Sequence, residues 1–302
     1  MRVFSLTQQE YSFLGFEDDG VMVDLTRSIS FYENAKQKVI RPPLETIEDL
    51  ILEGKLTLSY LGEVMTVVEE YGLRDDLVVT GQYDINPPVY PGKIIALGQN
   101  YLDHVREMNH EVPNKPVLFG KWPSCVIGHE EAIIKPDWIG RMDYEAELAI
   151  VMGADTWRVP SSDAMKFVAG YTCLNDVTAR DIQAEHISQS LPWMMSKNFE
   201  TFAPVGPCIL VKDAVEEPIA LGVQSRVNGQ LRQDGNTRDF IFDIPTIIEY
   251  ISTIMRLETG DIITTGTPMG VGPLEPGDIV EITCEGVGTL TNPVVSLNTS
   301  ER

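Results

Sequence analysis

The chain has 302 residues, of which 43% are hydrophobic and 23% charged, so it can bury a sizeable core and general disorder is excluded. Its formal net charge of −22 argues against DNA or RNA as a partner, because a broadly acidic surface cannot neutralise a row of phosphates. A small anionic substrate stays compatible with this charge, since it needs only a few local cations.

The N-terminal residues and the cysteines indicate the cellular compartment of the protein. MRVFSLTQQE lacks a basic stretch followed by an apolar one, which argues against a secretory signal. We expect no membrane span, because no run of about 18 apolar residues occurs. The four cysteines form no CxxC pair and indicate buried thiols, so a cytoplasmic protein is expected. They are Cys125, Cys173, Cys208 and Cys284.

The first 90 residues predict a small N-terminal domain with strands and helices. Two short apolar runs flank the turn EDDG, and two later segments carry helical periodicity. The predicted strands are MRVFSL at 1–6 and GVMVDL at 20–25, and the predicted helices cover about 44–52 and 58–71.

A proline-rich segment, DINPPVYPGK at 84–93, follows these elements. It predicts an extended connector, because proline neither continues a helix nor donates to a sheet ladder. We therefore place a domain boundary here, with residues 1–90 before it and 91–302 after it.

The second domain is predicted to be mainly β. Asn228-Gly229 inside SRVNGQLRQ is a strong signal for a hairpin turn. Helices do not alternate regularly with the strands, which argues against a doubly wound parallel sheet. The predicted strands are IIALG, ELAIVMG, CILV, LGVQSRV, DIITTG and DIVEITCEG.

One helix is predicted among these strands. Pro245 suits its first turn, and Gly260 is predicted to cap its C-terminus. Its apolar stripe would consist of Ile247, Ile248, Ile251, Ile254 and Met255.

The segment DYEAELAIVMG contains two glutamates two residues apart. On a strand, Glu145 and Glu147 would point to the same face, with Cα atoms about 6.5 Å apart. Carboxylates that close repel one another unless water screens them or a cation joins them. The alternative is a solvent-exposed strand face, so the pair alone does not establish a site.

A third carboxylate, Asp176, ends the β-rich stretch FVAGYTCLN and precedes a helix-compatible segment. It could cap that helix. It could also join Glu145 and Glu147 in holding Mg²⁺ or Mn²⁺, and Ca²⁺ would suit the same oxygen ligands. A site with three carboxylates leaves coordination positions open for water and substrate.

Two further segments offer basic groups. In GQNYLDHVREMNHE, a helix would place His104 and Glu107 on one face, where the carboxylate could orient the imidazole as a general base. In SKNFETFAPVGP, Lys197 precedes a Phe- and Pro-rich turn and could neutralise a carboxylate or an enolate. A mixed surface helix and a solvated lysine are the respective alternatives. The loop DIITTGTPMGVG adds hydroxyls and glycines that could approach a ligand closely.

Together these segments resemble the fumarylacetoacetate hydrolase (FAH) family, in particular its small FAH-domain members. The resemblance covers about 91–295 and rests on seven motifs in order: GxNYxxHxxE, PxxFxK, DxExELAxV, NDxxARDxQ, KxFxxFxPxGP, VNGxxRQxxNTxxxIF and GDIIxTGTPxGVG.

The resemblance implies an α+β, mainly β fold, in which a mixed β-sandwich or β-roll catalytic domain follows a smaller N-terminal α/β domain. It implies a homodimer, a metal site, and a His–Glu pair on a mobile segment. The implied metal ligands are Glu145, Glu147 and Asp176, the implied catalytic residues are His104, Glu107 and Lys197, and the implied substrate-binding residues are Arg106, Lys121, Gln183 and Thr267.

Some positions depart from the family pattern. The usual GKSFD reads SKNFE at 196–200, and Trp122 stands where proline is frequent. The stretch AEHISQSLPWMM at 184–195 matches no specificity known to us. These departures concern the pocket wall, so they leave the substrate open.

The resulting hypothesis is divalent-metal-dependent cleavage of a C–C bond in a 2-oxo or 2,4-dioxo acid, as in acylpyruvate or fumarylpyruvate hydrolysis, through a metal-stabilised enolate. Decarboxylation of oxaloacetate and isomerisation or decarboxylation of a dienoate are alternatives on the same site. A non-catalytic binding or regulatory protein is an alternative of another class. A metal-dependent phosphatase is disfavoured, because no second metal cluster or nucleophilic Asp motif is evident.

Overall fold

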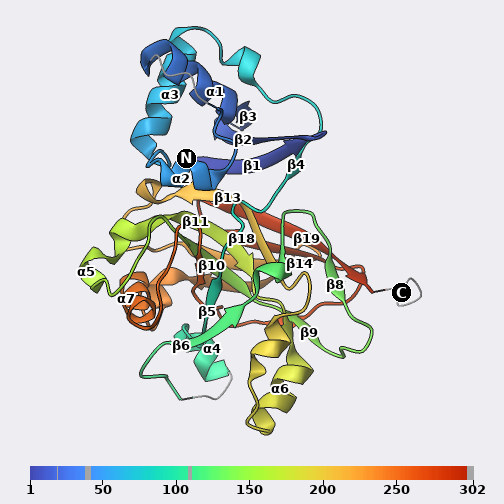
Figure 1. Cartoon of the computed structure of the whole chain (residues 1–302). Helices are drawn as coiled ribbons and strands as arrows, with labels where there is room; N and C mark the ends of the chain where they lie inside the picture. The colour runs from blue at the N-terminus through green and yellow to red at the C-terminus, as the bar shows by residue number, and fades with distance from the viewer. Residues whose placement is uncertain (19, 38–41, 108–110, 298–302) are drawn as a thin grey trace.

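The structure is a computed structural model that describes residues 1–18, 20–37, 42–107 and 111–297. Most of its regular structure is β-strand, arranged in three sheets with helices at the periphery (Figure 1). This confirms the predicted α+β, mainly β fold. Most strand pairs are antiparallel, so the sheet is not of the doubly wound parallel type.

The largest sheet runs through the middle of the molecule. Its central strands are buried along their whole length and consist mostly of hydrophobic and small residues, which suit a strand covered on both faces. Two short strands, β4 (Asp84–Ile85) and β7 (Val126–Ile127), pair at its side. Its order is β3 (Val21–Asp24), β2 (Tyr11–Asp18), β1 (Arg2–Gln8), β13 (Ala203–Val211), β11 (Val168–Asn175), β10 (Ala146–Met152), β16 (Ile262–Thr264), β5 (Ile94–Gly98) and β6 (Val117–Lys121).

Two smaller sheets complete the β structure. One packs against the large sheet, and hydrophobic side chains of both form a common core, as expected for a sandwich. Its order is β15 (Gln230–Asn236), β14 (Gly222–Val227), β18 (Ile279–Cys284), β19 (Gly288–Ser296) and β8 (Ile133–Lys135), and the third sheet is β12 (Thr178–Ala179), β9 (Met142–Tyr144) and β17 (Gly272–Pro273).

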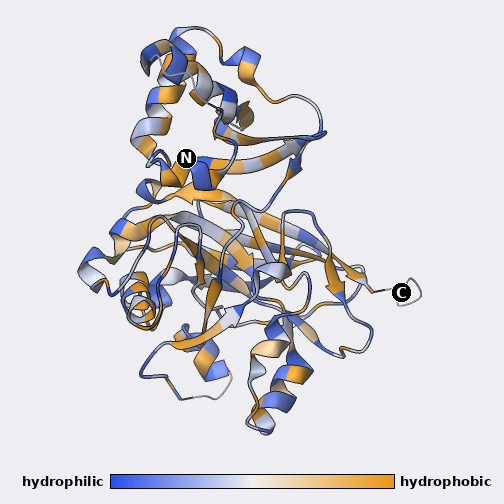
Figure 2. Cartoon of the chain, in the orientation of Figure 1, coloured by the Kyte–Doolittle hydropathy of each residue, from blue (hydrophilic) through white to orange (hydrophobic). Residues whose placement is uncertain are grey.

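The helices lie around these sheets. Figure 2 shows hydrophobic residues along the central strands and mixed hydropathy on the peripheral helices. No helix in the described ranges is long and apolar enough to span a membrane. The helices are α1 (Leu25–Tyr32), α2 (Ile47–Leu52), α3 (Leu58–Glu70), α4 (Leu102–Glu107), α5 (Ser161–Ala164), α6 (Arg180–Ser188) and α7 (Ile244–Ile254), and the short 3-10 segment Trp193–Lys197 follows α6.

The N-terminal part adds strands to the large sheet. Arg2 and Val3 of β1 pair with Leu210 and Ile209 of β13. A second hydrophobic cluster joins α1, α2 and α3 to buried residues of the large sheet. The first 90 residues therefore share a sheet and a core with the rest of the chain.

Several predicted elements need correction. The strands predicted at 1–6 and 20–25 are present as β1 and β3, but β2, which was not predicted, lies between them and pairs with both. The helix α1 was not predicted; Asp24 caps it by accepting from the Arg27 amide. Residues 108–110 of the predicted helix that follows Gln99 lie outside the described residues.

Other elements agree with the sequence. Asn228 and Gly229 both have positive φ and join β14 to β15, which is the predicted hairpin. Pro245 lies in the first turn of α7, but this helix ends at Ile254, so Gly260 does not cap it. Ile254 itself is exposed and outside the buried stripe. All four cysteines are free and buried, as predicted.

Candidate active site

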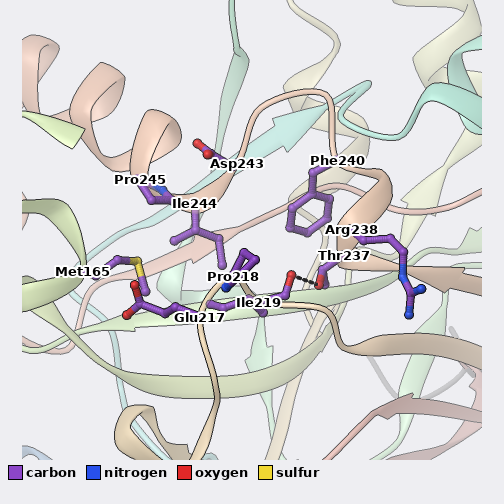
Figure 3. Close-up of a pocket in the computed structure, with 10 residues that line it drawn as sticks. All are labelled: Met165, Glu217, Pro218, Ile219, Thr237, Arg238, Phe240, Asp243, Ile244 and Pro245. Carbon is purple, nitrogen blue, oxygen red and sulfur yellow. Dashed lines mark hydrogen bonds between the residues drawn. The ribbon is translucent and has the colours of Figure 1, made fainter. Parts of the chain in front are cut away.

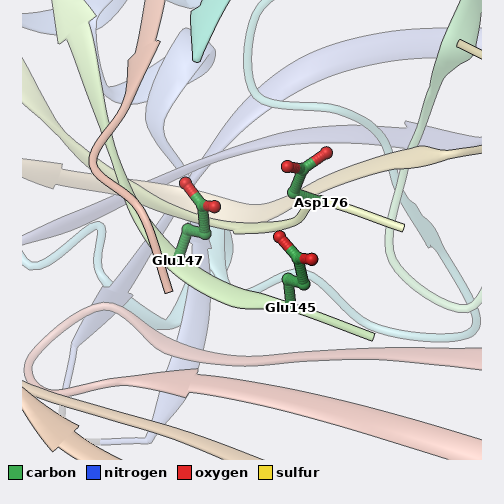
Figure 4. Close-up of side chains that lie close together, drawn as sticks. All are labelled: Glu145, Glu147 and Asp176. Atoms are coloured by element: carbon green, nitrogen blue, oxygen red, sulfur yellow. The ribbon is translucent and has the colours of Figure 1, made fainter. Parts of the chain in front are cut away.

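Three buried carboxylates lie together at the ends of two neighbouring strands (Figure 4). Glu145 precedes β10, Glu147 lies within it, and Asp176 directly follows β11. Because β10 and β11 run antiparallel, the end of one meets the start of the other, and the Asp176 amide donates to the Glu145 carbonyl at 2.9 Å. One oxygen from each carboxylate lies within 4.8 Å of the others.

The burial of this carboxylate cluster removes the structural alternatives. Glu145, Glu147 and Asp176 are 6%, 1% and 0% exposed, so the strand face that carries the glutamates is not solvent-exposed. Asp176 does not cap a helix, because Ala179 occupies the N-cap position of α6. Buried carboxylates need partners, so the surrounding positive charges decide what the cluster can bind.

Two buried lysines compensate part of this charge. Lys197 Nζ donates to Glu145 Oε2 at 2.8 Å and to Asp176 Oδ2 at 2.5 Å. Lys121 Nζ donates to Asp176 Oδ1 at 2.7 Å. Lys197 is 2% exposed, which excludes the alternative of a solvated lysine. Burial opposes the ionisation of Glu145, but the charges of Lys197 and Arg180 outweigh it and lower the pKa of Glu145.

Glu147 differs from the other two carboxylates. Within the described part of the chain it forms no ion pair, and its Oε2 accepts from the Gly266 amide at 2.9 Å. Burial, together with the charges of Asp176 and Glu145, raises the pKa of Glu147 to about 8. A divalent cation would supply the missing positive charge, and three carboxylates are a donor set that Mg²⁺ and Mn²⁺ prefer. The residues therefore fit such an ion.

An arginine that the sequence analysis did not single out orients the cluster. Arg180 donates through Nη2 to Glu145 Oε1, through Nε to Asp143 and through Nη1 to Gln183. Asp143 is fully buried and also accepts from Arg141. A signal in the sequence is the place of Arg180 in the motif NDxxARDxQ, four residues after Asp176.

Replacing Arg180 with lysine is expected to weaken Mn²⁺ binding about 10–100-fold, the loss typical when a group that orients a metal ligand is removed. Lysine keeps the charge but cannot hold Asp143 and Glu145 together through separate nitrogens. Arg141→Lys is the matched control, since Arg141 also binds Asp143 but is half-exposed and does not contact Glu145. Isothermal titration calorimetry measures both affinities. Equal affinities in the two variants would contradict the orienting role.

A histidine and a glutamate on α4 face the same region. His104 Nδ1 lies 3.3 Å from Glu107 Oε2, and the Gly270 amide also donates to the Glu107 carboxylate. The start of α4 is fixed by Asn100, whose amide nitrogen donates to the carbonyls of Phe242 and Thr265. The predicted His–Glu pair is thus formed, with Glu107 held from the loop after β16.

A cavity of about 160 Å³ joins the carboxylates to His104. Of the other predicted residues, Gln183 and Thr267 line it. Lys121 does not line it but donates a hydrogen bond to Asp176. Arg106 is exposed and does not line the cavity, so the structure does not bring it to the other predicted residues. Lining residues that the sequence analysis missed are Leu97, Gly98, Gln99, Val117, Phe119, Arg180, Ile187 and Trp193.

Another cavity, of about 430 Å³, lies beside the start of α7 (Figure 3). It is larger, but its lining brings together neither a histidine nor a group of carboxylates with metal-ligand spacing. Its walls are mostly apolar, and Asp243 in its rim caps α7. Chemistry rather than size therefore places the candidate active site at the carboxylate cluster.

The region that contains the carboxylates is similar to known proteins. Residues 93–295 match the family of the fumarylacetoacetate (FAA) hydrolase C-terminal domain. The chain is 43% identical over 211 residues to the oxaloacetate tautomerase YisK of Bacillus subtilis, covering 67% of this chain and 69% of that protein.

Solved structures extend the similarity to nearly the whole chain. A fumarylacetoacetate hydrolase from Exiguobacterium antarcticum is 32% identical with a TM-score of 0.79, over 98% of this chain and 100% of that one. A maleylpyruvate hydrolase from Sphingobium sp. SYK-6, in complex with manganese (II) and pyruvate, is 30% identical with a TM-score of 0.74, over 98% and 99%. The chain therefore belongs to the fumarylacetoacetate hydrolase family.

Proposed function

We propose that this chain is a divalent-metal-dependent enzyme that hydrolyses a C–C bond in a 2,4-dioxo acid of the acylpyruvate type. The observation that carries the proposal is a single cavity in which His104, paired with Glu107, faces three buried carboxylates. A base and a candidate metal site on one substrate-sized space are the requirements for this chemistry. The maleylpyruvate hydrolase with manganese and pyruvate supports it.

Glu145, Glu147 and Asp176 would hold the cation. When bound, such an ion acts as a Lewis acid that polarises a carbonyl oxygen. Lys197 and Lys121 hold Asp176 in place through hydrogen bonds, and Lys197 also fixes Glu145. Because these contacts leave Glu147 without a positive partner among the described residues, a bound cation would supply the charge that favours its ionised form.

His104 is proposed as the general base. With Nδ1 donating to Glu107, its Nε2 is the nitrogen that accepts a proton from water. The water oxygen adds to C4 of the dioxo acid, and the bond between C3 and C4 then breaks. The proton on His104 is delivered to C3, so the products are a carboxylic acid and pyruvate. Lys197, which lines the cavity, supplies positive charge beside the developing enolate.

A second candidate is the keto–enol tautomerisation of oxaloacetate. The name of the Bacillus subtilis relative favours it, and His104 could carry the proton between C3 and the enol oxygen without an attacking water. Both candidates need the same base and the same carboxylates. They differ in whether a C–C bond breaks.

A substrate panel separates these candidates. Purified protein with Mg²⁺ or Mn²⁺ is incubated with acetylpyruvate and with oxaloacetate, and products are followed by chromatography and by the enol absorbance. We expect acetate and pyruvate from acetylpyruvate above the metal-only blank, and no turnover after EDTA treatment. Loss of the oxaloacetate enol signal without any C–C cleavage would instead establish the tautomerase. The native metal and the predicted homodimer stay predictions that this panel does not address.

A further inference from the structure

We infer that the substrate carries an uncharged, apolar group on the far side of the breaking bond, so that its only carboxylate is that of the 2-oxo acid. This inference deepens the proposed function and rests on it. It follows from how charge and carbon are distributed over the wall of the cavity.

The basic side chains that line the cavity already donate hydrogen bonds to oxygen atoms of the protein. Apart from His104, the only basic side chains among the described lining residues are Arg180 and Lys197. Lys197 donates to two carboxylates of the cluster, and all three guanidinium nitrogens of Arg180 donate to protein oxygens. Arg106, the basic residue nearest in sequence to His104, is exposed and outside the lining. A second substrate carboxylate would find no unused lysine or arginine among the described lining residues.

The rest of the wall carries several apolar side chains. Phe119 and Trp193 pack with their ring centroids 4.8 Å apart, and Lys197 Nζ lies 5.3 Å from the centre of the Phe119 ring. The apolar side chains therefore begin directly beside the charged cluster. Val117 on β6 and Ile187 on α6 also line the cavity. We call Val117, Phe119, Ile187 and Trp193 the apolar wall.

A carboxylate placed against the apolar wall would lose water without gaining a partner, which is unfavourable. The neutral polar groups of the lining, such as Gln183 and Thr267, can bind a keto oxygen but cannot balance a charge. An alkyl group in the same place gains from burial against carbon. The cavity should therefore discriminate between substrates that differ only in their last group.

The test uses two acids of equal length, 2,4-dioxoheptanoate, which ends in a methyl group, and 2,4-dioxoheptanedioate, which ends in a carboxylate. With Mn²⁺ present, we expect kcat/KM for the first to exceed that for the second at least about tenfold, equivalent to about 1.4 kcal/mol. Equal values, or a preference for the dicarboxylate, would overturn the inference. If neither acid is cleaved above the metal-only blank, the proposed hydrolysis fails instead. Calorimetric affinities for the same two acids then still decide the inference.

A gain-of-charge variant tests the apolar wall itself. Ile187 is 55% exposed at the rim, so Ile187→Arg can be accommodated and would place a cation beside the far group. The ratio of kcat/KM values is expected to shift about tenfold toward the dicarboxylate. Ile254→Arg is the matched control, because Ile254 is also helical and 53% exposed but lies on α7 outside the cavity lining. An unchanged ratio in Ile187→Arg, or the same shift in the control, would overturn the assignment.

Discussion

Replacing Glu147 with glutamine is expected to reduce metal-dependent turnover to the level of the metal-only blank, while the melting temperature stays within about 2 °C of the parent. Glutamine keeps the shape of the side chain but removes one of the three anionic ligands. Because Glu147 forms no ion pair among the described residues, the change leaves no buried lysine without its partner. Steady-state kinetics at increasing Mn²⁺, with calorimetry of the melting transition, measures both effects.

The comparison with Asp176→Asn makes this result specific. Asp176 accepts from both Lys121 and Lys197, so its neutralisation leaves two buried ammonium groups with weakened partners. Breaking a buried ion pair in this way costs about 3–5 kcal/mol, so this variant should lose both turnover and thermal stability. If Glu147→Gln instead kept full activity after treatment with EDTA, the three carboxylates would not be a catalytic metal site.

Replacing His104 with alanine is expected to lower kcat for acylpyruvate hydrolysis by about 10²–10⁴-fold, the range typical for loss of a general base. The three carboxylates proposed to hold the metal are unchanged, so Mn²⁺ affinity should stay near that of the parent. The pH profile gives a readout that a structural role would not move. The acidic limb of the kcat/KM profile, which reports the ionisation of the base, should disappear in the variant.

Two further variants test whether the lower kcat comes from loss of the general base. Glu107→Gln keeps a hydrogen-bonding group near His104 Nδ1 but removes the charge that orients the imidazole, so a smaller decrease is expected. His129→Ala removes a histidine that accepts from the Thr291 amide and does not line the cavity, and its kcat should match the parent if the variant folds. Unchanged hydrolysis in His104→Ala would show that another group activates water.

Much of the candidate site was predictable because local periodicity places its residues. The two-residue spacing of Glu145 and Glu147 and the three-residue spacing of His104 and Glu107 act through strand and helix geometry alone. Contacts between residues far apart in the sequence were harder to predict. Arg180 lies 35 residues from Glu145 in sequence, and nothing in the local pattern shows that its guanidinium reaches this carboxylate.

The wall of the cavity was the least predictable part. Ile187 and Trp193 fall within the stretch 184–195, which matched no known specificity, and only the packing of α6 and the following 3-10 segment brings them to the cavity. For Arg106 the prediction failed in the other direction. Its position in a motif implied substrate contact, but the structure leaves it exposed and outside the cavity lining. In the N-terminal part, β2 was missed because its buried residues do not alternate strictly with exposed ones.

The pairing of β1 with β13 determines what a truncation of the N-terminal part would expose. β13 is buried along its whole length, and Arg2 and Val3 occupy part of the hydrogen-bonding edge that faces away from β11. A chain cut at the proline-rich connector would present that edge, with its apolar residues, to solvent. Exposed, uncharged strand edges readily pair with other chains. We therefore expect the first 90 residues to protect the large sheet from self-association, so that their removal should change solubility before activity.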